Sequence, residues 1–245
     1  RLRAKHKRNP PFALSGCLRP IPSNPPTRKF PMLQPYTLLH AACPAGAIEN
    51  LYIPAQGTPR GVAIVHHPNP LQGGTFTNKV AHTAAKALAQ LGFYCYLPNS
   101  RGTGNSEGEH DYGAGESDDM AALAQWAKQR HPEAPLLALA GFSFGGYVAT
   151  LAAERVQPDL LLLVGAALGH YKNRTPAPSA PKPERTLLVH GATDEVVALQ
   201  NVLNWAAPQN LPVIVLPEAS HFFHGKLIPL RDTLLRFIPP LLEAA

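Results

Sequence analysis

Between residues 136 and 146 the chain reads Leu-Leu-Ala-Leu-Ala-Gly-Phe-Ser-Phe-Gly-Gly, and this stretch decides the fold. An apolar run of strand length ends at Gly141, Ser143 stands between Gly141 and Gly145, and a helix-like segment follows. Gly-x-Ser-x-Gly between a strand and a helix is typical of a nucleophilic serine on a sharp turn, where glycines leave room that a Cβ would fill. Because short motifs recur by chance, a glycine-rich turn with an inert serine is the alternative.

Strand-like and helix-like segments alternate on both sides of this stretch. Short apolar runs predict strands over 61–66, 93–97, 136–140, 159–164, 186–190 and 213–216. Longer runs with helical spacing predict helices over 78–91, 118–130, 145–156, 196–206 and 227–242. Two further runs, Tyr36–Ala42 and Ala47–Ile53, predict an antiparallel pair. The alternation predicts an α/β fold whose mostly parallel central sheet is flanked by helices on both faces, in a single domain over residues 32–245.

The first 31 residues differ from the rest in composition. They contain eight Lys or Arg, seven prolines, no Asp or Glu and no apolar periodicity. This composition predicts an extension that is disordered or not native. The first methionine is Met32, which we take as the natural start of the protein. A basic arm for nucleic acid or a membrane is the alternative interpretation.

Charge and hydropathy of the remaining residues exclude several functions. Outside the first 31 residues, 14 basic side chains stand against 16 acidic ones, so no nucleic-acid partner is expected. No apolar run approaches the ~18 residues of a membrane span, and no membrane association is expected. The three cysteines, at 17, 43 and 95, have neither disulfide nor metal-ligand spacing. Free thiols favour a cytoplasmic location.

Acidic and imidazole side chains follow two later strands. Ligands of an open α/β sheet bind at the carboxyl ends of its strands. Asp194 comes after the strand 186–190, and His221 comes after the strand 213–216. A serine hydroxyl needs a neutral imidazole to take its proton, and the imidazole needs a carboxylate to orient it. We therefore predict Ser143 as nucleophile, His221 as base and Asp194 as acid.

Three other residues compete for these roles. His224 is the second candidate for the base, Glu195 is the second for the acid, and Asp159 is a more distant candidate that is expected to begin a strand. Glu195 is expected to open the helix 196–206, where it faces the helix dipole. Phe222 and Phe223 are expected to anchor the His221 loop in the core.

An oxyanion hole needs two backbone N–H groups aimed at the developing charge. One is expected from Phe144, which follows the nucleophile. The other is expected from the loop 67–74, in which the two prolines at 68 and 70 have no N–H. Asn69 and Leu71 remain, and Asn69 is preferred. His66, His67 and His190 are interpreted as structural.

The loop 99–108 contains three glycines and Arg101. Its spacing does not fit the dinucleotide-binding fingerprint. We interpret it as a structural loop near the site in which Arg101 pairs with a carboxylate.

Six ordered segments of the chain resemble a known family. They are His-His-Pro-Asn-Pro-Leu-Gln-Gly-Gly (66–74), Asn-Lys-Val (78–80), Ser-Arg-Gly-x-Gly-x-Ser-x-Gly (100–108), Gly-Phe-Ser-Phe-Gly-Gly (141–146), His-Gly-x-x-Asp (190–194) and Ser-His-Phe-Phe-His-Gly (220–225). Together they resemble the small, lidless bacterial α/β-hydrolases, relatives of the dienelactone hydrolases and short-chain carboxylesterases. The resemblance implies carboxylester hydrolysis with Ser143, Asp194 and His221 as the catalytic triad. It departs from the family at Asn69, where a second histidine is expected.

The segment from Gly165 to Arg185 spans 21 residues with four prolines, which is too short for a helical cap. An open, shallow site that presents Ser143 to solvent is expected. We expect a serine hydrolase that cleaves ester or thioester bonds of a small-molecule substrate through an acyl-enzyme, without cofactor or metal. Hydrolysis of a peptide amide or C–C bond, or a non-catalytic binding module of the same fold, are the alternatives.

Overall fold

The structure of the protein is a computed structural model that describes residues 36–243. The predictions for residues 1–31 and for Met32 lie outside these residues.

Residues 36–243 contain one eight-stranded sheet with the strand order β1-β2-β4-β3-β5-β6-β7-β8. The strands are β1 (Thr37–Cys43), β2 (Gly46–Ile53), β3 (Gly61–His66), β4 (Phe93–Pro98), β5 (Leu136–Phe142), β6 (Leu160–Val164), β7 (Thr186–Gly191) and β8 (Val213–Leu216). Strand β2 runs antiparallel to both β1 and β4, and all pairs from β4 to β8 are parallel. The predicted α/β class and the predicted antiparallel pair are confirmed.

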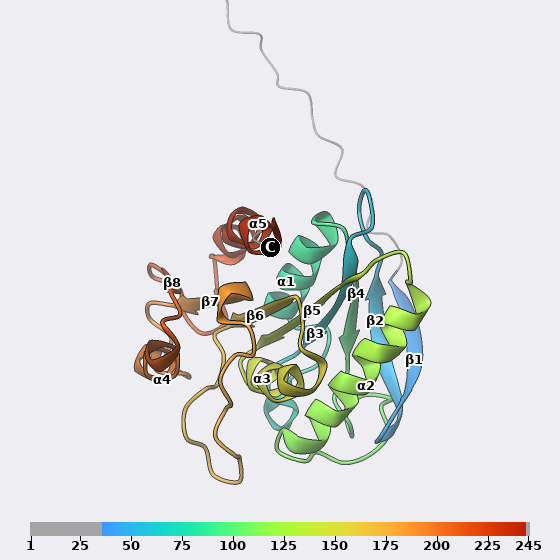
Figure 1. The fold of residues 1–245 in the computed structure, drawn as a ribbon. Coiled ribbons are helices and arrows are strands. Elements are labelled where there is room, and N and C mark those ends of the chain that lie inside the picture. The colour runs from blue at the N-terminus through green and yellow to red at the C-terminus, as the bar shows by residue number, and fades with distance from the viewer. Residues whose placement is uncertain (1–35, 244–245) are drawn as a thin grey trace, which may run out of the picture. The chain divides into compact units, whose positions relative to one another are not determined.

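Helices cover both faces of the sheet (Figure 1). The α-helices are α1 (Lys79–Gln90), α2 (Ala114–Arg130), α3 (Phe144–Val156), α4 (Leu199–Ala206) and α5 (Leu227–Glu243). Three short 3-10 helices are η1 (Pro70–Gln72), η2 (Pro183–Arg185) and η3 (Ala207–Gln209). Helices α1 and α5 pack on one face, and α2, α3 and α4 pack on the other. None of the helices in residues 36–243 has the length and apolar character that crossing a membrane takes.

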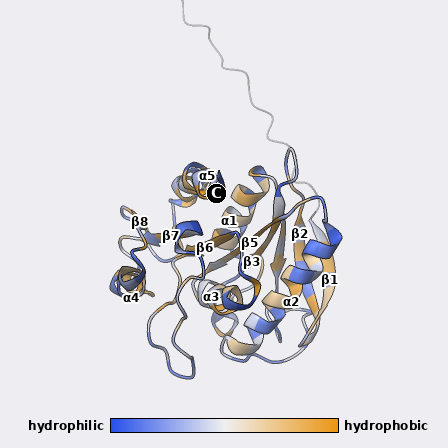
Figure 2. Ribbon diagram, in the orientation of Figure 1, coloured by the Kyte–Doolittle hydropathy of each residue, from blue (hydrophilic) through white to orange (hydrophobic). Residues whose placement is uncertain are grey.

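Strand β5 lies in the middle of the sheet and contributes to the cores on both faces. Ala138 and Ala140 point into the core under α1 and α5, whereas Leu137 and Leu139 point into the core under α2 and α3. This alternation follows from the two-residue period of a strand. Because both faces are covered, the central strands consist mainly of apolar residues, as Figure 2 shows.

Two helix starts differ from the predicted ones by more than one residue. Helix α2 begins at Ala114 rather than at residue 118, because the Glu116 carboxylate accepts hydrogen bonds from the Gly113 and Asp111 N–H groups and caps the first turn. Helix α4 begins at Leu199 rather than at residue 196. The N–H groups at 196 and 197 donate to the Asp194 carboxylate and are therefore held in a turn.

Candidate active site

Ser143 alone forms the turn between β5 and α3. The strand runs two residues further than predicted, to Phe142, and the helix begins at Phe144. Ser143 has φ 56° and ψ −117°, a strained conformation for a residue with a side chain. Its N–H donates to the Val164 carbonyl oxygen at 3.1 Å, which fixes the turn against β6.

Glycines allow the backbone to close around this turn. A Cβ at Gly141 would overlap the carbonyl of Gly145, and a Cβ at Gly145 would overlap the carbonyl of His66. The glycine requirement inferred from the motif is thus a requirement for close backbone approach. It brings the end of β3 directly against the first turn of α3.

The structure brings together the three side chains that the sequence selected. The Ser143 hydroxyl donates to His221 Nε2 at 3.0 Å, and His221 Nδ1–H donates to Asp194 Oδ2 at 2.8 Å. These residues follow β5, β8 and β7, three parallel strands whose carboxyl ends lie at the same edge of the sheet. His221 is 1% exposed, and the Asp194 side chain is fully buried.

The Asp194 carboxylate is held on both oxygens. Burial by itself opposes its ionisation, but the hydrogen bonds from His221 and from the N–H groups of Val197 and Val196 outweigh burial and lower the pKa of Asp194. Oδ1 accepts from Val196 at 2.9 Å and from Val197 at 2.7 Å, whereas Oδ2 accepts from His221 and has His190 Nε2 at 3.4 Å. His190 Nε2–H donates to the Val197 carbonyl at 2.9 Å and thus supports the same turn. The carboxylate is therefore charged and fixed in orientation.

The competing residues lie elsewhere. His224 is exposed, and Asp159 precedes β6 at the opposite edge of the sheet, where it accepts from the Leu137 N–H. Glu195 does not open α4 as predicted. Its Oε2 accepts a hydrogen bond from the His221 N–H at 3.1 Å and thus supports the backbone of that histidine.

The two phenylalanines after His221 have different environments. Phe223 is fully buried and anchors the loop, as predicted. Phe222 is 41% exposed, so the expectation that it also anchors the loop is wrong. Its ring packs against those of His221 and Phe142.

The loop after β3 presents Asn69 to Ser143. The Asn69 side chain accepts a hydrogen bond from the Leu71 N–H at 3.0 Å. The Leu71 N–H, the other candidate donor for the oxyanion hole, is therefore already hydrogen-bonded. The Asn69 carbonyl accepts from Gln72 and Gly74 and closes the loop. Among the described residues, neither the Asn69 N–H nor the Phe144 N–H has a hydrogen-bond partner, and both residues lie beside Ser143. Asn69, which stands where the family resemblance leads us to expect a histidine, thus shapes this loop.

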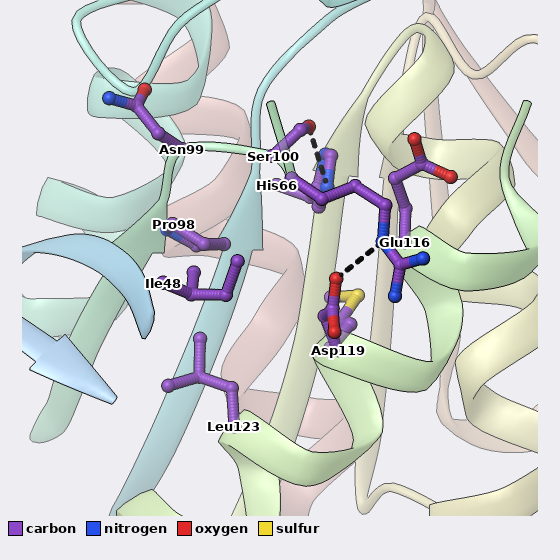
Figure 3. Close-up of a pocket in the computed structure, with 10 residues that line it drawn as sticks. Ile48, His66, Pro98, Asn99, Ser100, Glu116, Asp119 and Leu123 are labelled. Atoms are coloured by element: carbon purple, nitrogen blue, oxygen red, sulfur yellow. Dashed lines mark hydrogen bonds and ion pairs between the residues drawn. The ribbon is translucent and has the colours of Figure 1, made fainter. Parts of the chain in front are cut away.

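Two buried histidines support the loop from below. His67 Nδ1–H donates to the Pro68 carbonyl at 2.6 Å, and its Nε2 accepts from the Ser100 N–H at 2.9 Å. His66 Nδ1–H donates to the His67 carbonyl, and its Nε2 lies 3.2 Å from the Ser100 hydroxyl (Figure 3). Burial and the neighbouring His66 lower the pKa of His67 to about 3. Both rings are therefore neutral, and both support the loop, in agreement with the prediction that these histidines are structural.

Arg101 is likewise structural. Its Nε–H donates to the Asp119 carboxylate at 2.7 Å, which confirms the predicted pairing with a carboxylate (Figure 3). The space between Arg101, His66 and α2 has a volume of about 10 Å³, room for about one water molecule and not for a substrate.

Two hollows meet at Ser143. The His221 hollow has a volume of about 270 Å³, and its lining is Pro68, Asn69, Gln72, Gly73, Gly74, Asn78, Ser143, Val196, His221 and Phe222. The Arg174 hollow has a volume of about 210 Å³, and its lining is Asn69, Gln72, Ser143, Phe144, Ala167, Tyr171, Arg174, Val196 and Val197. Ser143 itself is only 8% exposed, so it meets solvent at the bottom of these hollows and not in the open, shallow site that the sequence predicted. It lies at the floor where the hollows meet, because the loops after β3, β6 and β7 rise around it.

Sequence reasoning missed Tyr171 and Arg174. They lie in the loop between β6 and β7, where no periodicity marks a residue as inward-facing. The sequence signal that could have found them is the position of this loop. It begins at the carboxyl end of β6, the strand next to β5.

Known proteins share this fold. The chain is 34% identical to XC6422 from Xanthomonas campestris, described as an α/β serine hydrolase without lid; the TM-score is 0.76, with 86% of this chain and 96% of that chain covered. An α/β serine hydrolase homologue from Coxiella burnetii is 35% identical, with a TM-score of 0.75 and coverage of 82% and 96%. The model of the X-Pro dipeptidyl-peptidase (S15) family matches residues 49–175. The chain belongs to the S15 family and to the lidless α/β serine hydrolases.

Other relatives of this lidless hydrolase differ in length and description. RP471 from Rickettsia prowazekii, described as uncharacterized, is 30% identical over 75% of this chain and 80% of its own length. A probable dipeptidyl-aminopeptidase B from Chaetomium globosum is 27% identical, but the match covers 56% of this chain and only 19% of that protein. The hydrolase fold is therefore shown, while the bond that this chain cleaves is not decided by its relatives.

Proposed function

We propose that this protein hydrolyses carboxylic ester or thioester bonds of small substrates through an acyl-enzyme intermediate. The observation that carries the proposal is the continuous chain of hydrogen bonds from Ser143 through His221 to Asp194. This arrangement, at the floor of two hollows, is suited to nucleophilic acyl transfer.

The proposed reaction proceeds in two stages. Ser143 Oγ attacks the substrate carbonyl while His221 Nε2 takes its proton, and Asp194 stabilises the imidazolium. The N–H groups of Phe144 and Asn69 donate to the oxyanion, consistent with their lack of other partners among the described residues. The C–O or C–S bond then breaks, and His221 returns the proton to the departing alcohol or thiol. Water, deprotonated by His221, attacks the acyl-enzyme; the bond between the acyl carbon and Ser143 Oγ breaks, His221 returns the proton to Oγ, and the acid is released.

Replacing the nucleophile tests this proposal. Ser143→Ala is expected to lower kcat for p-nitrophenyl acetate by at least about 10⁴-fold, because no other group supplies the attacking oxygen. Labelling by a fluorophosphonate probe is expected to disappear with it. Ser179→Ala, which changes an exposed serine of the β6–β7 loop, is the matched control and is expected to retain turnover. Equal turnover by wild type and Ser143→Ala would contradict the proposal, and a wild type that neither turns over nor labels would favour a binding module.

Peptide hydrolysis is the second candidate, favoured by the match to the S15 family model. A dipeptidyl peptidase acts next to a free N-terminal ammonium group, which a carboxylate is suited to bind. Among the described residues, neither hollow at Ser143 is lined by Asp or Glu, and one contains Arg174. We therefore expect faster turnover of p-nitrophenyl esters than of X-Pro p-nitroanilides. The reverse order would replace the ester proposal by the peptidase one.

A further inference from the structure

The two hollows have distinct roles in the proposed reaction. His221 Nε2–H returns its proton to the departing alcohol, so that alcohol must lie on the side of His221. His221 lines the His221 hollow and does not line the Arg174 hollow. The alcohol therefore occupies the His221 hollow, and the acyl group extends into the Arg174 hollow.

Arg174 is held in that hollow by aromatic rings. Its guanidinium carbon lies 4.7 Å from the ring centroids of Phe144 and Tyr171 and 5.4 Å from that of Tyr147. Cation–π contacts of this kind supply no oxygen acceptor, so the guanidinium N–H groups remain able to donate hydrogen bonds to a ligand. Phe144 follows the nucleophile directly, so the cation is tied to the start of α3.

The guanidinium has no anionic partner. Within residues 36–243 its side chain makes no hydrogen bond and no ion pair, and no Asp or Glu lines the Arg174 hollow. The Arg174 side chain is half-buried, and burial lowers its pKa. Because the ordinary pKa of arginine is very high, the group nevertheless stays charged at neutral pH. Glu116 acts on the guanidinium through space but makes no ion pair with it, so a ligand carboxylate in direct contact would stabilise this half-buried cation.

We infer that Arg174 binds a carboxylate on the acyl group, so that the preferred substrates are monoesters of short dicarboxylic acids. The planar guanidinium edge matches a carboxylate with two parallel hydrogen bonds. Hydrolysis breaks the acyl C–O bond, places the water oxygen on the acyl carbon and the proton on the departing alcohol, and releases a dicarboxylic acid. This inference rests on the proposed esterase function and specifies its substrate.

A matched pair of esters tests the inference. The charged esters are the monomethyl esters of succinic, glutaric and adipic acid, and methyl 4-methylpentanoate has nearly the shape of the first without its charge. Wild type is expected to show a kcat/KM that is about 10- to 100-fold higher for the best charged ester. Arg174→Gln is expected to remove this preference. Lys172→Gln, which removes an exposed cation two residues away, is expected to retain it.

The outcomes separate the inference from the function on which it rests. A wild type that cleaves the neutral ester as fast as the charged ones, or an Arg174→Gln variant with the wild-type preference, would overturn the carboxylate site and leave the esterase intact. If no ester is cleaved, the esterase proposal fails. Calorimetric binding of monomethyl glutarate to Ser143→Ala, with and without Arg174→Gln, then decides the site: equal affinities would refute it, and at least tenfold weaker binding would support it.

Discussion

At the scale of single residues, Asp194 offers the sharpest test of the proposed mechanism. In Asp194→Asn, Oδ1 still accepts from Val196 and Val197, but an NH₂ group replaces the oxygen that faces His221. A donor at this position favours the tautomer of His221 that carries its proton on Nε2, which cannot take the proton of Ser143. The expected result is a loss in kcat on the order of 10⁴-fold with the thermal stability largely kept.

Glu195→Gln is the matched control for that variant. It neutralises the adjacent carboxylate but keeps an oxygen for the His221 N–H. Its kcat for p-nitrophenyl acetate is expected to stay within tenfold of wild type. A comparable loss in both variants would mean that the field of the two carboxylates, rather than the tautomer of His221, governs the rate.

Ser143, Asp194 and His221 were accessible to sequence reasoning because each follows a recognisable apolar strand. Strand ends on a parallel sheet have a known location, so the residues after them can be placed together without a structure. Tyr171 and Arg174 were not accessible. The Arg174 guanidinium lies over the rings of Phe144 and Tyr147, which are distant along the sequence and carry no complementary pattern.

At the scale of elements, the contact between β3 and α3 depends on Gly145. In Gly145→Ala the new methyl group would meet the His66 carbonyl, a backbone atom that cannot rotate away. An overpacked core typically costs ~1–3 kcal/mol. We expect the free energy of unfolding to fall by an amount at the upper end of this range or above it. Urea denaturation measures it. Gly57→Ala is the control, since its Cβ would meet nothing and only the positive φ costs ~1–2 kcal/mol. A smaller loss at Gly145 than at Gly57 would contradict the steric explanation.

The existence of the helices was predictable, whereas two of their starts were not. Apolar spacing marks the body of α2 and α4, but their first turns are decided by Glu116 and Asp194. Glu116 extends α2 by capping it, and Asp194 withholds two N–H groups from α4. A carboxylate in the sequence does not show which N–H groups it will bind, so these boundaries need the structure.

At the scale of the whole molecule, buried neutral histidines make the fold sensitive to acid. Burial lowers the pKa of His66, His67 and His190, in the case of His67 to about 3. In the unfolded chain each titrates near 6.5, so below this pH the unfolded state binds more protons than the folded state. The free energy of unfolding that these histidines contribute is therefore fully present above about pH 6.5. It falls as the pH drops, by ~1.4 kcal/mol per pH unit for His67 alone.

Urea unfolding between pH 7.5 and 5 measures this slope. His67→Asn keeps a donor for the Pro68 carbonyl and removes the titrating group. Its free energy of unfolding is therefore expected to change less steeply with pH than that of wild type, by about the contribution of one histidine. Identical slopes for variant and wild type would exclude His67 as a source of acid sensitivity.

The fold class was predictable from the alternation of strands and helices, but the strand order was not. Central strands such as β3 and β6 are apolar on both faces, so their sequences do not record which neighbour they pair with. The position of β4 between β2 and β3 depends on the packing of whole elements.

The 21-residue connection that replaces a lid also bears on the fate of the acyl group. On the proposed mechanism, the acylated Ser143 lies below two hollows, and no segment of residues 36–243 closes over them. Enzymes that transfer acyl groups to a second alcohol must keep water away from this intermediate. If the proposed mechanism holds, bulk water reaches it through these hollows as soon as the first alcohol leaves, and solvent, in vast excess over any competing acceptor, favours hydrolysis.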